Sequence, residues 1–100
     1  MAEDRIFVNQ DALQFYIDAE MDISTATKVE LKYRKPGGTE GVVTGSLDST
    51  QYVKYDMVQG ASFLDTSGWW YFWVYITFAD GRKAPGIPFK RFVYEEGTLK

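Results

Sequence analysis

The sequence contains no cysteine and no histidine. Without cysteine the chain can form no disulfide, no thiolate nucleophile and no thiolate metal site. Histidine is the most common general base and the most common neutral metal ligand, so its absence removes both options. We therefore predict a protein that is not an enzyme, with no catalytic residues, no metal site and no cofactor.

The sequence also lacks a basic block and a long apolar run. The formal net charge is −3, and the basic residues within positions 28–35 are interrupted by Glu30 and by apolar residues. A nucleic-acid-binding protein would carry a positive patch, so we predict no nucleic-acid partner. The longest apolar run, residues 69–78, is well short of the ~20 residues of a membrane-spanning helix. The N-terminus lacks a signal-peptide pattern. We expect a soluble protein with no membrane segment and no signal peptide.

Turn-forming residues are frequent and regularly spaced. They recur about every 8–14 residues, which is typical of an all-β sandwich or barrel. In residues 28–35, KVELKYRK, apolar and charged residues alternate with the period of a half-buried strand. Asp80-Gly81 indicates a two-residue hairpin. We predict that residues 1–100 form a single domain, an all-β, immunoglobulin-like antiparallel β-sandwich of about seven strands, with a small barrel as the main rival.

One predicted strand is unusually aromatic. Aromatic residues make up 17% of the chain, and residues 68–81, GWWYFWVYITFADG, hold all the tryptophans. In a strand, the even positions from Trp70 to Phe78 form a core face, and the odd positions form a second face that also lacks charge. Tryptophan and tyrosine are enriched in interface hot spots. We therefore predict a protein interface at Trp69, Tyr71, Trp73 and Tyr75.

Two alternative roles for this odd face stay open. In the first, a loop or the N-terminal segment of the same chain covers it. In the second, its rings stack on sugars, as in carbohydrate-binding modules. A stripe about 20 Å long is large for an unoccupied monomer surface, so we expect something to cover it.

A short acidic segment resembles the beginning of a calcium-binding loop. Asp18, Glu20 and Asp22 have the i, i+2, i+4 spacing with which such a loop begins. The sixth position should be glycine and the twelfth a bidentate glutamate, but the chain has Ile23 and Val29 there. We therefore predict a solvated acidic turn at this segment rather than a metal site.

Two segments carry a resemblance to a known family. Residues 23–41 contain a loop, a strand and a PGG turn, and residues 64–94 contain the aromatic strand and its hairpin. In these segments the sequence resembles short immunoglobulin-like structural proteins of tailed bacteriophages. It departs from their pattern at Trp69, Tyr71 and Trp73, where smaller or polar residues are expected. The matching residues are Ala26, Val29, Leu31, Tyr33, Lys35, Pro36, Gly38, Thr39, Asp65, Gly68 and Trp70.

The beginning of the aromatic strand also resembles the sixth strand of immunoglobulin-like domains. In those domains a tight turn leads to a corner aromatic residue, and a core residue follows two positions later. Trp70 stands at the corner position, and Phe72 stands where antibodies have a cysteine. Phe72 is therefore expected to fill the centre of the domain by packing.

The resemblance to phage proteins implies a function. It implies a virion protein of the tail, neck, baseplate or capsid-decorating type, assembled in the host cytoplasm. Its partners would be other virion proteins or further copies of itself. We therefore predict a non-enzymatic structural or attachment module that acts through protein–protein contacts. The alternative is a carbohydrate-binding β-sandwich module that uses the same surface tryptophan and tyrosine residues.

Overall fold

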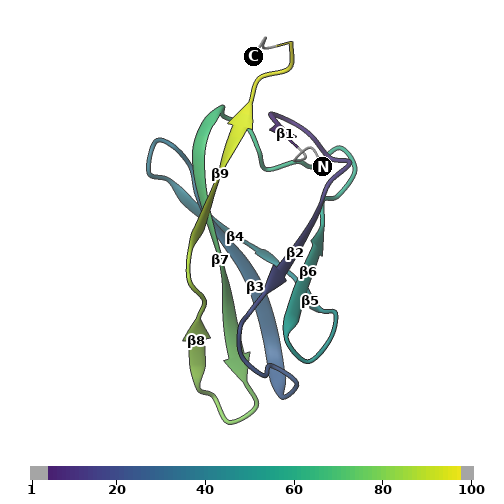
Figure 1. The fold of residues 1–100 in the computed structure, drawn as a ribbon, viewed down its shortest axis with the longest axis vertical. Helices are drawn as coiled ribbons and strands as arrows, with labels where there is room; N and C mark the ends of the chain where they lie inside the picture. Colours follow the sequence, from purple (N-terminus) through teal and green to yellow (C-terminus); the bar gives the residue numbers. More distant parts are fainter. Residues whose placement is uncertain (1–4, 98–100) are drawn as a thin grey trace.

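The computed structural model describes residues 5–97, which form two layers of β-strands (Figure 1). Residues 1–4 and 98–100 of the predicted domain lie outside this description. Within the described part, no helix is long and apolar enough to cross a membrane. The strands are β1 (Ile6–Phe7), β2 (Gln14–Asp18), β3 (Ala26–Arg34), β4 (Glu40–Thr44), β5 (Ser46–Leu47), β6 (Tyr52–Asp56), β7 (Gly68–Phe78), β8 (Lys83–Pro85) and β9 (Phe89–Tyr94).

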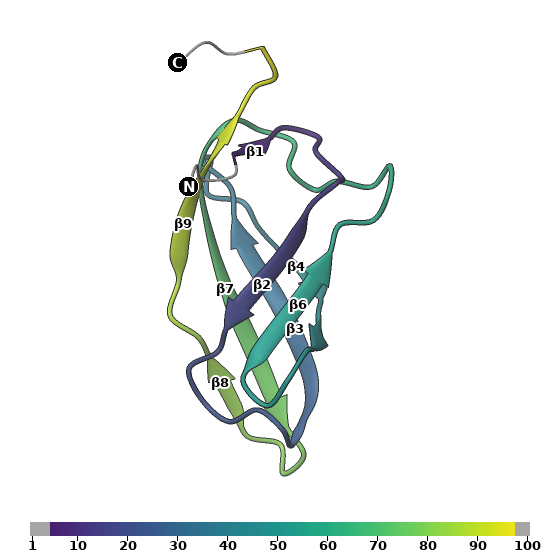
Figure 2. The same ribbon diagram turned by 45° about the vertical axis from the view of Figure 1, so that its right-hand side comes forward.

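The strands form a large sheet and a small sheet that pack face to face. The large sheet has the order β1-β9-β7-β3-β4, with β8 also paired to β7, and the small sheet has the order β2-β6-β5. Figure 2 shows β2 and β6 as the layer in front of β3 and β7. All the pairs are antiparallel except β1 with β9, which is parallel. The predicted all-β, immunoglobulin-like sandwich is confirmed.

Residues 5–97 form nine strands instead of the predicted seven or so because of two short additions. The segment GVVTGSL divides at Gly45 into β4, which pairs with β3, and β5, which pairs with β6. A Cβ at Gly45 would lie only 3.0 Å from Val53 Cγ1, so a small residue suits this crossing between the sheets. The other addition is β8, which pairs with the end of β7.

The two prolines near the C-terminus lie at an interrupted edge of the large sheet. Pro85 ends β8, and Pro88 precedes β9. Both strands pair with the same side of β7, one beyond the other. Between them, the Gly86 N–H donates a hydrogen bond to Val74 O of β7 at 2.8 Å. Because proline cannot donate a ladder hydrogen bond, the edge is broken between β8 and β9.

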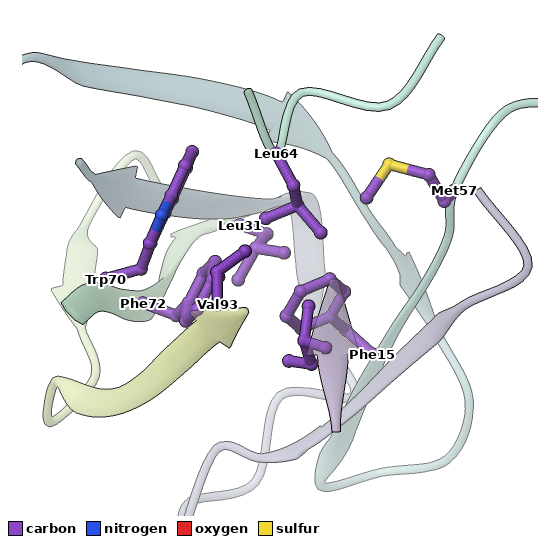
Figure 3. Packing of buried hydrophobic residues seen from close by; sticks show 8 residues of the cluster. Phe15, Leu31, Met57, Leu64, Trp70, Phe72 and Val93 are labelled. Carbon is purple, nitrogen blue, oxygen red and sulfur yellow. The ribbon is translucent and has the colours of Figure 1, made fainter. Parts of the chain in front are cut away.

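The core lies between the sheets and depends on the inward side of β7. Trp70, Phe72 and Ile76 are each 0% exposed. Figure 3 shows Phe72 beside Phe15, a residue of β2 in the opposite sheet, and their ring centroids are 5.0 Å apart. Large aromatic side chains contribute most of the apolar area that a small sandwich buries. Phe72 therefore fills the centre as expected.

Trp70 also fixes the entry of β7. Its Nε1–H donates to Thr66 O at 2.8 Å, four residues upstream. This bond satisfies the one polar atom of a fully buried indole, in the manner of the corner residue of immunoglobulin-like domains. Nearby, the Lys35 ammonium donates to Asp65 Oδ2 at 2.7 Å and lowers the pKa of that carboxyl. The loop before β7 is thus held to the end of β3.

Two neighbouring substitutions test this division of β7. Phe72→Ala should lower the free energy of unfolding by about 3–5 kcal/mol, because it leaves a cavity between the sheets. Tyr71→Ala, on the outward side, should lower it by about 1 kcal/mol or less. Urea unfolding followed by circular dichroism measures both values. Equal losses for the two variants would contradict the assignment of the core.

Candidate protein interface

The four residues predicted as an interface lie together on the outward face of the large sheet. Trp69 is 51% exposed and Tyr71 is 39% exposed, whereas Trp73 and Tyr75 are half-buried. No loop within residues 5–97 covers Trp69 or Tyr71. Burial therefore alternates along β7 as the sequence indicated. That these residues form an interface with another protein stays a prediction.

Basic side chains from β3 line one side of these rings. The Lys32 ammonium lies 4.0 Å from the ring centroid of Tyr75, and the Arg34 guanidinium lies 5.8 Å from the rings of both Tyr71 and Trp73. The antiparallel register accounts for this placement, because Lys32 is opposite Trp73 and Arg34 is opposite Tyr71. Cations over aromatic faces are attracted by the ring quadrupole, and their methylene stems pack on the rings.

On the other side of β7, further aromatic residues extend the row. The Lys90 ammonium lies 4.8 Å from the ring of Trp69, and the Phe92 ring packs edge-on against Trp69 at 5.1 Å. The Tyr94 ring follows at 4.8 Å from Phe92, and the Phe7 ring of β1 lies 6.2 Å from Tyr94. The aromatic strip, as we name it, consists of Phe7, Trp69, Tyr71, Trp73, Tyr75, Phe92 and Tyr94.

The part of the strip contributed by β9 and β1 was not predicted from the sequence. The alternation in FKRFVY puts Phe92 and Tyr94 on one side of a strand, and this signal was readable. Placing them beside Trp69 requires the pairing of β7 with β9, which sets Trp69 opposite Phe92. Such pairing joins residues far apart in the chain, and the sequence pattern alone does not fix it.

A hollow opens in the middle of the strip. It has a volume of about 320 Å³ and is lined by Arg34, Tyr71, Trp73 and Pro88. It lies beside the interruption between β8 and β9, where Pro88 prevents continuous strand pairing. The hollow is therefore a consequence of the broken edge, and it is open to a side chain from outside.

The outward face of the large sheet carries a positive charge although the chain is negative overall. Two of its cations are paired with acids, Lys28 with Glu30 at 3.5 Å and Arg34 with Glu40 at 3.1 Å. Cations outnumber acids on this surface, in contrast to the net charge of −3 of the chain. We name the strip together with its cations the basic aromatic face. The outward charged residues are Lys28, Lys32, Arg34, Lys83 and Lys90, and the acids Glu30 and Glu40.

In the acidic segment that resembles a calcium loop, the carboxylates of Asp18 and Asp22 accept hydrogen bonds from other groups of the chain. Asp18 Oδ1 accepts from the Glu20 N–H at 2.8 Å and from Gln51 Nε2 at 2.7 Å. Asp22 Oδ1 accepts from the Ser24 N–H at 2.9 Å, and this bond lowers the pKa of Asp22. Within residues 5–97, no group of three or more acidic side chains is placed to hold a metal ion. The carboxylates stabilise turns at the end of β2.

Comparison with known proteins supports the fold. No protein-family model and no curated protein matches the chain. Among solved structures, the chain is similar to CopC from Methylosinus trichosporium OB3b, with a TM-score of 0.61 and 12% sequence identity. The similarity covers 100% of this chain and 91% of CopC. At this identity the match shows a shared β-sandwich fold and nothing about function.

The resemblance to tailed-bacteriophage proteins is wrong. The matching solved structure is CopC, which is not a phage protein, and no family or curated protein supports a phage origin. The residues behind the resemblance are structural ones: Leu31 and Trp70 are fully buried, and Asp65 holds a loop by pairing with Lys35. Any sandwich of this plan needs such residues. The virion role and location rested on this resemblance and lose their basis.

The exposure of the strip predicts how its tryptophans respond to a quencher. Trp69 is exposed, Trp73 is half-buried and Trp70 is fully buried. Acrylamide should therefore quench Trp69 most strongly. Trp69→Phe should remove the largest part of the quenchable emission, and Trp73→Phe should remove less, as measured by Stern–Volmer titration. If Trp69→Phe left the quenching unchanged, Trp69 would be covered in solution.

Proposed function

We propose that this protein is a non-enzymatic binding module that acts through protein–protein contacts on its basic aromatic face. The observation that carries the proposal is the exposure of Trp69 and Tyr71, at 51% and 39%, on the face with the hollow. Large aromatic side chains exposed together are unusual on a monomer surface and mark interaction sites. Trp69, Tyr71, Trp73 and Tyr75 would be the anchors.

The composition of this face is that of an interface hot spot. Tryptophan, tyrosine and arginine are the residue types most enriched among hot spots, and these types surround the hollow, in which Arg34 meets Tyr71 and Trp73. Hot-spot side chains typically fill a partner's pocket or form one. The hollow, at about 320 Å³, has room for one large side chain of a partner. Loss of one such anchor typically weakens binding by ~2 kcal/mol or more, about 30-fold.

The anchors are also held in place before any partner arrives. β7 pairs with β3 on one side and with β8 and β9 on the other. The Lys32 and Lys90 ammonium groups contact the rings of Tyr75 and Trp69, respectively, so these rings have reduced freedom. Binding to an ordered surface loses less conformational entropy than binding to mobile loops. This favours the sheet face over the loops as the contact surface.

The alternative, a carbohydrate-binding module, fits this face less well. A sugar ring stacks on an open aromatic face. Here Lys32 lies over Tyr75, Lys90 over Trp69, and Arg34 near both Tyr71 and Trp73. A sugar would first have to displace these cations. The acids on the face, Glu30 and Glu40, are both in ion pairs, which leaves little for acid–base chemistry and agrees with a non-enzymatic module.

Site-specific crosslinking in cells that express the protein tests the proposed function. A photoreactive benzoylphenylalanine at position 71 should give a discrete crosslinked product that contains a defined polypeptide, identified by mass spectrometry. Trp69→Ser in the same chain should reduce its yield about tenfold or more, because an anchor is lost. Position 58 provides the matched control, because Val58 is exposed at 58% in the loop after β6.

The control at position 58 distinguishes a specific contact of position 71 from non-specific crosslinking of any exposed residue. Equal product patterns at positions 71 and 58 would contradict the proposal, since any exposed residue would then react alike. A glycan array provides the second arm: binding of a polysaccharide that Trp69→Ser abolishes, without a protein crosslink at position 71, would favour the carbohydrate alternative.

A further inference from the structure

The outward face of the small sheet has the opposite charge to the basic aromatic face. Register places the side chains of Tyr16, Asp18 and Asp56 outward from β2 and β6, since these positions alternate with buried Phe15 and Val53. The acidic face, as we name it, consists of Gln14, Tyr16, Asp18, Asp48, Tyr52, Lys54 and Asp56.

The acidic face has an aromatic centre. Tyr16 is 53% exposed, and its ring stacks on Tyr52 with a centroid distance of 4.7 Å and an interplanar angle of 13°. The Tyr16 hydroxyl donates to Asp48 Oδ2 at 2.7 Å. An exposed tyrosine whose hydroxyl is bonded to an acid is complementary in chemistry to a hollow lined by rings and a guanidinium.

Some of the charged groups on each face have no ion-pair partner within residues 5–97 of one copy. On the acidic face, Asp18, Asp48 and Asp56 bond to uncharged groups and enter no ion pair among residues 5–97. On the basic aromatic face, Lys32 and Lys90 contact rings but no carboxylate of residues 5–97. Unpaired charges of opposite sign on two surfaces favour contact between those surfaces and disfavour contact of either surface with itself.

We propose that the occupant of the basic aromatic face is a second copy of this chain, which docks through its acidic face. This inference rests on the proposed function and names its partner. Tyr16 of the second copy would enter the hollow beside Arg34, and its Asp48 and Asp56 would lie near Lys32 and Lys90. In this contact a sheet of one copy packs face to face on a sheet of the other, as the two sheets within one copy do, at a spacing of about 10 Å.

The position of the two faces determines the kind of assembly. They lie on opposite sides of the sandwich, one on each sheet (Figure 2). The contact therefore joins different surfaces of the two copies, and each docked copy still offers one free face. Such head-to-tail contacts form rings or open chains rather than closed dimers.

The size of the acidic face indicates weak association. The small sheet has three strands, of which β2 and β6 have five residues each, so the face measures about 17 Å by 14 Å, roughly 240 Å². This is smaller than the ~800 Å² that each partner buries in a standard interface. We expect a dissociation constant of about 100 µM and strong dependence on salt, since the charges remain partly solvated.

Sedimentation velocity with charge-reversed variants tests the inference. The wild type should form species larger than a monomer between about 10 µM and 1 mM, and about 0.5 M NaCl should reduce them. Lys32→Glu/Lys90→Glu and Asp48→Lys/Asp56→Lys should each sediment as monomers, because each variant carries one sign on both faces. An equimolar mixture of the two variants should regain the association, because each then offers the face that the other lacks.

Control variants separate a face-specific effect from a general change in charge or folding. Arg82→Glu reverses a residue that is 83% side-chain exposed in the β7–β8 hairpin, and it should associate like the wild type, whereas Lys90→Glu alone should weaken association about tenfold. Melting curves should show that all the variants are folded.

Three results would overturn the inference: a wild type that stays monomeric, an Asp48→Lys/Asp56→Lys variant that still associates, or a mixture that does not regain association. A monomeric wild type that crosslinks from position 71 to a different polypeptide would overturn self-docking and leave the proposed function standing. A monomeric wild type without such a crosslink would contradict both.

Discussion

The pairing of β7 on both sides is the constraint on which this structure depends. A strand hydrogen-bonded to β3 on one side and to β8 and β9 on the other cannot rotate, so its successive side chains must point to opposite faces. Trp70 and Phe72 need the interior to bury their area. Trp69 and Tyr71 are then directed outward by the same backbone. Their exposure follows from the requirements of the core.

The basic residues around the strip keep such a surface compatible with water. Lys32, Arg34 and Lys90 contact the outward rings and present their charges to solvent. These cations also give the face a sign opposite to that of the small sheet. In the proposed function, the apolar area would supply affinity for a partner and the charge would determine which partner binds. The same side chains would thus both solvate the strip and take part in the proposed contact.

The sequence predicted those features that depend on local pattern. Alternation and turn residues indicated the sandwich, the two faces of β7 and the corner role of Trp70, because these follow from backbone geometry within a few residues. The crossing at Gly45 and the addition of Phe92 to the strip depend on which strands pair and in what register, and the alternation within one segment does not determine either. The phage resemblance failed because core and turn residues are shared by unrelated sandwiches. The hollow beside Pro88 could not be predicted, because it forms only where β8 and β9 pair with β7 and leave a gap between them.

The most direct measurement of the central claim uses the three tryptophans as probes of the two faces. The protein labelled with 5-fluorotryptophan should give one ¹⁹F resonance for each residue, assigned by single Trp→Phe variants. On association, the resonances of Trp69 and Trp73 should shift or broaden, and that of the buried Trp70 should not. If the Trp69 resonance stayed unchanged while the protein was bound, the basic aromatic face would not be the contact surface.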